Sequence, residues 1–120
     1  MSIEFSSLSE KRADYARQMK LAVERIVKIL PSMPGVQRVS LFGSYARGRA
    51  DLFTDLDVLV IMKTNQGFVD RLRMLYGALV VTVDMDLLCY TPEEFESLKD
   101  QPFLKRALKD EVVLYAKTTD

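Results

Sequence analysis

The sequence predicts an α/β (α+β) domain in which helices flank a mixed β-sheet of about four strands. Strand-like apolar runs alternate along the chain with segments of helical periodicity, which is the pattern of a sheet covered by helices. The chain has 120 residues, of which 48% are hydrophobic and 28% charged. That composition suits a folded domain with its own core. We therefore expect residues 1–120 to form a single domain.

The expected elements follow one another without an internal repeat or a low-complexity linker. In order they are a helix that stops at Pro31, a strand at 36–42, a helical turn and loop at 43–54, a strand at 55–62, a helix at 66–78, a strand at 79–90, a helix that begins after Thr91, a short helix at 102–109 and an edge strand at 111–116.

The first helix, the turn after it and the first strand are predicted from local signals. Ser9 or an earlier serine can cap the helix, whose apolar positions include Leu21 and Ile26. Pro34 and Gly35 favour a turn, and the apolar run that follows indicates a strand. Residues 43–54 are too polar and too rich in glycine to continue that strand.

The segment at 66–78 has helical spacing, with Phe68 and Leu72 on one face. Arg71 and Arg73 of this segment are interpreted as an ordinary solvated face, and Tyr76 as a packing residue.

The C-terminal third carries a further strand and two helix starts. The run "LVVTVDMDLLCY" at 79–90 indicates a strand, in which Cys89 is interpreted as a small core residue. Thr91 is a good N-cap, Pro92 suits the first helical turn, and acidic residues follow near the positive helix end.

Composition excludes several classes of function. The chain has 17 basic and 17 acidic residues, so no global basic field favours binding to a long nucleic acid. It has no histidine, which excludes Ser-His-Asp triads, HExxH zinc sites and histidine general bases. Its one cysteine cannot form an internal disulfide, which fits a reducing cytoplasm. No apolar run approaches the length needed to span a membrane, so we expect no membrane partner.

Four aspartates stand at alternating positions inside apolar strands. Alternate strand residues face the same side, so Asp55 and Asp57 point together, as do Asp84 and Asp86. If the two strands are neighbours, their carboxylates converge, and like charges at that distance need a positive partner. An all-oxygen donor set suits Mg²⁺ or Mn²⁺ better than Zn²⁺. The structural alternative is neutralisation by basic side chains, for which the candidates are Arg47, Arg49 and Lys63.

A turn upstream of these aspartates adds a candidate phosphate site. Gly43 lets a phosphate approach the backbone, and backbone N–H groups together with the Ser44 hydroxyl can bind its oxygens. A phosphate site beside metal-binding carboxylates is what metal-assisted phosphoryl or nucleotidyl transfer requires.

The stretch "GSYARGRADLFTDLDVLV" resembles the signature of the DNA polymerase β-like nucleotidyltransferase superfamily. More narrowly, the chain resembles the minimal nucleotidyltransferases, with a Gly-Ser-x-Ala-Arg-Gly stretch followed by an Asp-x-Asp strand. "VDMDLLCYTPEEFE" is similar to their third-carboxylate strand and the helix after it. Thr54 stands where the family commonly has serine, which is a minor departure because both are small hydroxyl residues. The resemblance implies the nucleotidyltransferase fold.

The resemblance implies roles for residues at both motifs. Gly43 and Ser44 would contact the β- and γ-phosphates of a nucleotide. Arg47 belongs to the Ala-Arg-Gly stretch, which serves triphosphate binding or loop structure.

The carboxylates take their implied roles from the same resemblance. Asp55, Asp57 and Asp86 would be the catalytic and metal-binding residues. Asp86 would also serve as the base for the acceptor hydroxyl, with Asp84 as the reserve assignment.

The implied function is transfer of a nucleoside monophosphate, AMP from ATP, to an acceptor hydroxyl with Mg²⁺ or Mn²⁺. Small members of the family are often paired with a helical HEPN-type toxin, so the acceptor is expected on a partner protein. The alternatives are a binding module of the same fold that neutralises by contact, a small-molecule transferase of the antibiotic-modifying kind, and a purely structural domain. Exposed edges around residues 112–115 would permit a homo-oligomer.

Overall fold

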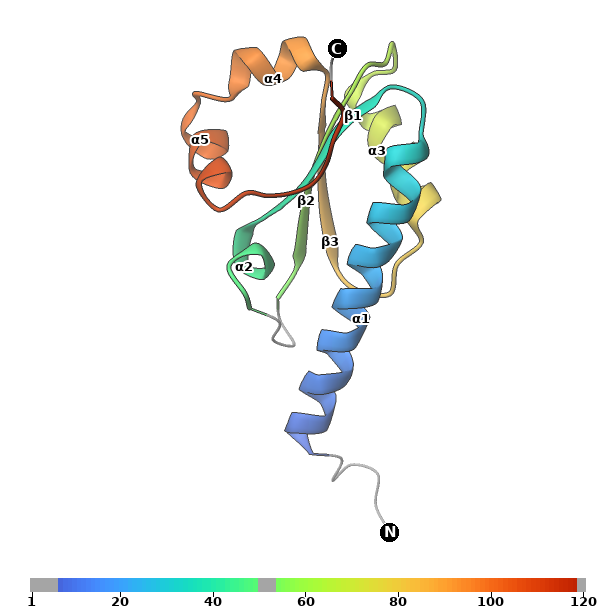
Figure 1. The fold of residues 1–120 in the computed structure, drawn as a ribbon, viewed down its shortest axis with the longest axis vertical. Helices are drawn as coiled ribbons and strands as arrows, with labels where there is room; N and C mark the ends of the chain where they lie inside the picture. Colours follow the sequence, from blue (N-terminus) through green and yellow to red (C-terminus); the bar gives the residue numbers. More distant parts are fainter. Residues whose placement is uncertain (1–6, 50–53, 119–120) are drawn as a thin grey trace.

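The computed structural model describes residues 7–49 and 54–118 and shows a mixed sheet flanked by helices, which confirms the predicted fold class. The sheet has four strands in the order β3-β2-β1-β4 (Figure 1). β1 runs antiparallel to β2 and β4, whereas β3 runs parallel to β2. The elements are α1 (Leu8–Ile29), η2 (Leu30–Ser32), β1 (Val36–Phe42), α2 (Gly43–Ala46), β2 (Leu56–Met62), α3 (Phe68–Leu79), β3 (Met85–Tyr90), α4 (Pro92–Leu98), α5 (Pro102–Lys109) and β4 (Val112–Ala116).

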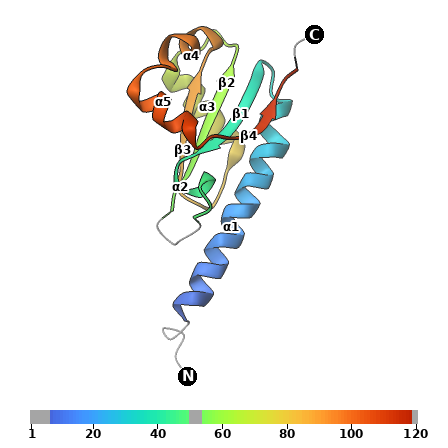
Figure 2. The same ribbon diagram turned by 60° about the vertical axis from the view of Figure 1, so that its left-hand side comes forward.

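Helices α1 and α3 cover one face of the sheet (Figures 1 and 2). Residues of β2 alternate between faces, and Val58 and Val60 belong to the core beneath these helices. Met19 and Ile26 of α1 and Leu75 of α3 are fully buried against them. This is the larger of the two apolar clusters.

Helices α4 and α5 lie over the other face (Figure 1). There Leu59 and Ile61 of β2 pack with Phe95 of α4 and Leu104 of α5, and Phe42 completes the cluster. Because β2 is covered on both faces, its sequence is almost continuously apolar, as expected for a central strand. Asp57 is the exception within it, and it lies on this second face.

Most predicted boundaries agree with the structure. The N-cap of α1 is a serine before Ser9, namely Ser7, whose hydroxyl accepts from the Glu10 N–H. The strand predicted over 79–90 is wrong at its beginning. Leu79 is the last residue of α3, and Val80 ends the helix in the left-handed conformation with φ +40°. The error arose because Leu79 and the valines after it form an apolar run, but Leu79 is buried as part of a helix face.

The interpretation of Arg71 as a solvated residue is also wrong. Its guanidinium is buried, donating to the Glu94 carboxylate at 2.7 and 3.2 Å and to the backbone carbonyl of Gln66 at 2.8 Å. Glu94 also accepts from the Thr91 N–H in a capping box that starts α4. Arg71 thereby connects α3 to α4 across the end of β3.

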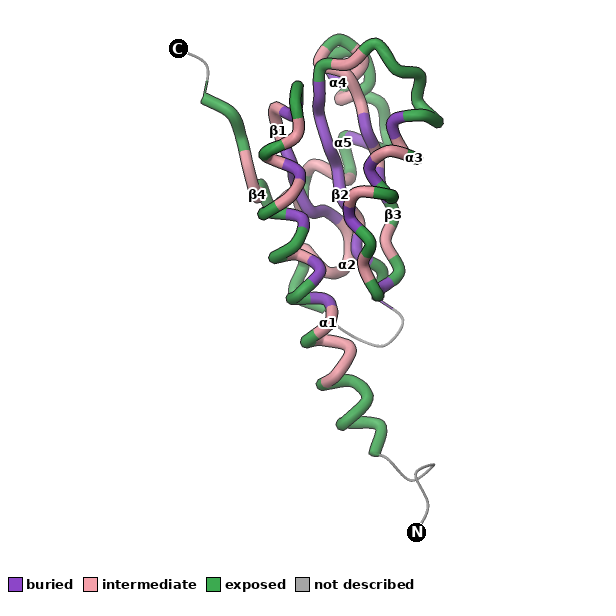
Figure 3. Tube along the Cα trace, turned by 90° about the vertical axis from the view of Figure 1, so that its right-hand side faces the viewer, coloured by how far each residue is buried: buried purple, intermediate pink, exposed green. Residues whose placement is uncertain are grey.

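Helix α1 extends past the sheet, which gives the molecule its long axis of 59 Å against 28 Å in the other two directions. The first turns of α1 are exposed along their whole circumference (Figure 3). Burial begins near Tyr15, whose hydroxyl donates to the Thr54 carbonyl at 3.1 Å. No helix among residues 7–49 and 54–118 is both long and apolar enough to cross a membrane.

Candidate active site

The predicted carboxylates meet at the end of the sheet where β2 and β3 begin. Asp57 is the register partner of Asp86 on the parallel strand β3 and of Phe42 on the antiparallel strand β1. Partners in register project to the same face, so Asp57 and Asp86 lie on the face covered by α4 and α5.

Asp55 and Asp84 stand one step closer to this end of the sheet, just before β2 and β3 begin, and both are exposed. The Leu56 N–H donates to the Asp84 carbonyl at 2.9 Å, which continues the parallel pairing to this level. The strand predicted to start at Asp55 therefore begins one residue later.

Gly43 and Asp57 are in direct contact. A Cβ at position 43 would lie 2.2 Å from Oδ2 of Asp57, and Gly43 has φ +73°. Glycine is required here for two reasons: its backbone is left-handed, and the Cβ of any other residue would displace the carboxylate. The glycine of the predicted phosphate turn thus packs against the central predicted carboxylate.

The charges around Asp57 show that the three carboxylates interact. Burial raises the pKa of Asp57 above its usual value, the charges of Asp86 and Asp55 raise it further, and Arg47 opposes the shift. Asp84 and Asp55 both act on Tyr15, whose pKa is raised mainly by burial. The strand register, in which Asp57 is paired with Asp86, places these two carboxylates side by side.

A divalent cation fits this donor set chemically, since it would offset the carboxylate repulsion that adds to burial in raising the pKa of Asp57. Among residues 7–49 and 54–118, however, no three side chains of the Asp, Glu, His or Cys type are arranged to hold a metal ion by themselves. Mg²⁺ is usually bound by one or two carboxylates together with substrate phosphates and water. The arrangement suits a metal that arrives with a nucleotide.

A pocket of about 600 Å³ opens beside the two paired aspartates. Apart from these, its walls are apolar or aromatic and come from β1, α3, β3 and α5. The lining residues are Phe42, Asp57, Phe68, Leu72, Tyr76, Asp86, Leu87, Leu88 and Phe103.

A second pocket of about 200 Å³ shares Phe42 and Phe103 with the first and lies on the side of Gly43. Its lining includes two arginines and one aspartate. Its remaining lining residues are Gly43, Arg47, Arg106, Ala107 and Asp110. Phe103 and Arg106 of α5 were not predicted as site residues, because nothing in the local sequence indicates that α5 folds back over the turn.

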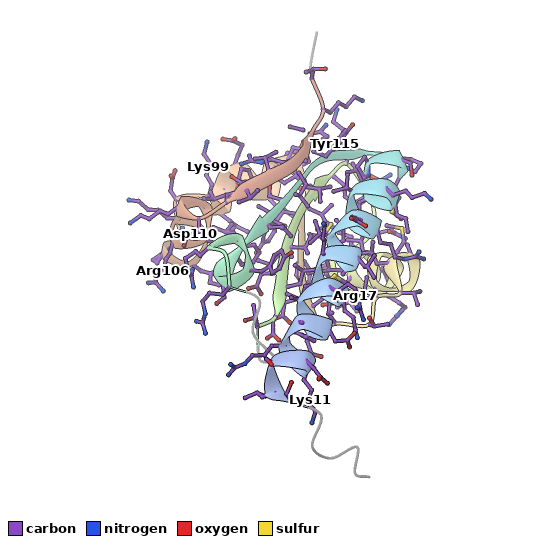
Figure 4. All side chains as sticks on the ribbon, turned by 60° about the horizontal axis from the view of Figure 1, so that its bottom comes forward. Lys11, Arg17, Lys99, Arg106, Asp110 and Tyr115 are labelled. Carbon is purple, nitrogen blue, oxygen red and sulfur yellow. The ribbon has the colours of Figure 1, made fainter. Side chains whose placement is uncertain are left out.

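Arg47 is placed between the predicted phosphate turn and α5. Its Nη1 lies 3.0 Å from Oδ2 of Asp110, and its Nη2 donates to the Ser44 hydroxyl at 3.4 Å. Asp110 lies beside α2 (Figure 4). Arg47 therefore has a carboxylate partner outside the aspartate group, although it is close enough to lower the pKa of Asp57.

Lys63, a candidate for neutralising the aspartates, lies at the wrong end of the sheet. It follows Met62, and its N–H donates to the Gly35 carbonyl at 2.9 Å. At about 3.3 Å per residue, the length of β2 places it roughly 20 Å from Asp57. Lys63 cannot pair with these carboxylates.

Comparison with known proteins identifies the family of this chain. A family model described as a nucleotidyltransferase domain matches residues 23–118. A protein of Methanocaldococcus jannaschii is 33% identical over 89 residues, which cover 72% of this chain and 88% of its own length; its name gives protein adenylyltransferase as an inferred activity.

Solved structures share the fold. A Sulfolobus solfataricus crystal structure, described as an inferred nucleotidyltransferase, matches with a TM-score of 0.55 and 23% identity over 92% of this chain and 87% of that chain. A toxin-antitoxin structure with AMP-PNP matches with a TM-score of 0.56 and 24% identity over 79% of this chain and 73% of that chain. The chain therefore belongs to the nucleotidyltransferase domain family and is, by that membership, a transferase.

Proposed function

We propose that this chain transfers a nucleoside monophosphate, AMP from ATP, to a hydroxyl group of a partner protein in the presence of Mg²⁺ or Mn²⁺. The single observation that carries the proposal is the contact of Asp57 with Gly43 on one side and its pairing with Asp86 on the other. This contact brings the turn that would bind phosphate next to a pair of carboxylates that line one pocket.

In this proposal the turn binds the triphosphate. Gly43 offers its backbone to the β- and γ-phosphates, and the Ser44 hydroxyl donates to a phosphate oxygen. Arg47 is within reach of Ser44 and would exchange its contact with Asp110 for the triphosphate. An arginine suits this role because its planar group can bind two oxygens of a phosphate.

The carboxylates have two tasks. Asp55, Asp57 and Asp86 would hold the divalent cation, which supplies charge neutralisation for the phosphates when it is bound. Asp86, the exposed residue of the edge strand β3, would accept the proton of the acceptor hydroxyl. The acceptor oxygen then bonds to the α-phosphorus, the bond from that phosphorus to the bridging oxygen breaks, and pyrophosphate leaves.

The proposal of a protein acceptor rests on two similarities. The Methanocaldococcus jannaschii relative is named for adenylyl transfer to protein. Two structures with this fold are toxin-antitoxin structures, one of them with AMP-PNP. A helical HEPN-type toxin is the partner we propose, by resemblance to the minimal nucleotidyltransferases.

The test is to incubate the chain with Mg²⁺, a candidate helical partner and ATP labelled either on the α- or on the γ-phosphate. We expect label from the α-phosphate on the partner, none from the γ-phosphate, and none with EDTA or with Asp57→Asn. Stable binding of the partner without label would instead favour a module that acts by contact. Label from the γ-phosphate would refute nucleotidyl transfer.

A further inference from the structure

Tyr76 makes two backbone hydrogen bonds that flank Asp86. Its hydroxyl donates to the Met85 carbonyl at 2.9 Å and accepts from the Leu87 N–H at 3.0 Å. These are the residues immediately before and after Asp86. Tyr76 is itself 41% exposed, so burial of its ring is not what accounts for this placement.

The position of β3 explains why a side chain is needed there. β3 is an edge strand, with β2 on one side only. The Leu56 N–H donates to the Asp84 carbonyl, so even-numbered residues of this segment direct their backbone groups toward β2. Met85 and Leu87 therefore direct theirs to the open side, where no strand pairs with them.

The Tyr76 hydroxyl takes the place of the missing strand at one point. A neighbouring strand would offer a donor and an acceptor at this level, and the hydroxyl offers both. Since β3 is then held from both sides at residues 85–87, the Cα of Asp86 is fixed relative to Asp57 on β2. Tyr76 and Asp86 also line the same pocket.

We propose that Tyr76 is a positioning residue that holds Asp86 in place for metal-dependent nucleotide binding. This inference rests on the proposed function, because it takes Asp86 to be a metal ligand. The competing explanation is that Tyr76 only covers the edge of the sheet. On that explanation its hydroxyl contributes to stability and leaves the affinity for the metal–nucleotide complex unchanged.

The test compares Tyr76→Phe with Tyr90→Phe, which removes a hydroxyl from β3 itself, four residues beyond Asp86. For each variant, calorimetry gives the Kd of ATP with saturating Mg²⁺ and the Kd of ATP with EDTA. Loss of an interaction that orients a metal ligand typically weakens metal affinity by about 10- to 100-fold. We expect Tyr76→Phe to weaken Mg²⁺·ATP binding about tenfold or more, to leave metal-free ATP within about twofold of wild type, and Tyr90→Phe to change neither.

A double-mutant cycle tests whether the effect acts through Asp86. In an Asp86→Asn background, Tyr76→Phe should weaken Mg²⁺·ATP binding by less than about twofold, because the group that it positions no longer ligates. The proposal is overturned if Tyr76→Phe binds Mg²⁺·ATP like wild type. Equal loss of affinity with and without metal, or an undiminished effect in the Asp86→Asn background, would overturn it as well.

Amide hydrogen exchange at Leu87 provides a readout that needs no ligand. Loss of the hydrogen bond from the Leu87 N–H to the Tyr76 hydroxyl should accelerate exchange of this amide about fivefold or more in Tyr76→Phe. Unchanged exchange would refute the idea that the Tyr76 hydroxyl holds this part of β3 in place. A wild-type chain that binds no Mg²⁺·ATP would refute the proposed function and, with it, the metal-positioning role. A wild type that binds while Tyr76→Phe binds equally well would refute this inference alone.

Discussion

Substitution of Gly43 by alanine introduces both backbone strain and a displacement of the Asp57 carboxylate, and comparison with alanine variants of other glycines separates the two effects. The new Cβ would lie 2.2 Å from Oδ2 of Asp57, and ordinary contact begins at 3.4 Å. The carboxylate must therefore move by about 1 Å, which it can do by rotating, because it is the end of a side chain. A displacement of about 1 Å at a reacting group can cost about a hundredfold in activity.

Two other glycines provide matched controls. Gly48 has φ +95° and nothing within 4 Å of its added Cβ, so Gly48→Ala carries the strain without the contact. Gly35 has φ +88° and would place its Cβ 2.3 Å from the carbonyl oxygen of Lys63, which is backbone and cannot rotate away. The strain alone costs about 1–2 kcal/mol.

The three variants should rank differently in stability and in ligand binding. We expect Gly43→Ala and Gly48→Ala each to lose about 1–2 kcal/mol of unfolding free energy, a fall of about 4–8 °C in Tm. Gly35→Ala should lose more. Only Gly43→Ala should also bind Mg²⁺·ATP about tenfold or more weakly, as measured by calorimetry at a temperature where all three are folded. Equal Mg²⁺·ATP affinity in Gly43→Ala and Gly48→Ala would refute the reasoning.

Three further predictions concern charge and burial. The pKa of Asp57 is raised in the folded state, so its ionised form destabilises the fold at pH values above that pKa. Asp57→Asn should therefore raise the Tm of the metal-free chain near pH 7. This gain in Tm should shrink as the pH falls toward 4, because Asp57 then becomes protonated in the wild type. Arg71→Met removes one partner of the Arg71–Glu94 pair and should lower the free energy of unfolding, measured in urea, by about 2 kcal/mol. The loss is smaller than for a fully buried pair because the Glu94 side chain is 42% exposed. The control Arg73→Met, at a side chain that is 76% exposed, should cost less than about 0.5 kcal/mol. Burial raises the pKa of Cys89 to about 11, so a thiol reagent at pH 8 should label it only after the chain unfolds; rapid labelling of the native chain would contradict its burial.

Features that depend on neighbours in sequence were predictable. The strand at Val36–Phe42 and the turn at Gly43 follow from an apolar run that a glycine interrupts, and both are confirmed. The pairing of Asp57 with Asp86 could be proposed only on the condition that their strands were neighbours. Their parallel register joins two strands that α3 separates in the chain, and no local pattern reveals it.

Features that depend on distant partners were missed. Arg71 has the composition of a solvated helix position, and its partner Glu94 stands 23 residues away on another helix. The helical pattern indicates only a packing role for Tyr76, because it does not reveal the partners of the hydroxyl, Met85 and Leu87. The apolar run across Leu79 and Val80 predicted strand, and only the packing of α3 decides that Leu79 ends a helix.

The most direct measurement is thermal unfolding of the chain with and without ATP and Mg²⁺, repeated with Asp57→Asn. A ligand that binds only the folded state at about 100 times its Kd adds roughly 2.7 kcal/mol, or about 10 °C in Tm for a domain of this size. We predict this shift for the wild type, its loss on chelation of the metal, and its absence in Asp57→Asn. An equal Mg²⁺-dependent shift in Asp57→Asn, or none in the wild type, would contradict a metal–nucleotide site built on Asp57.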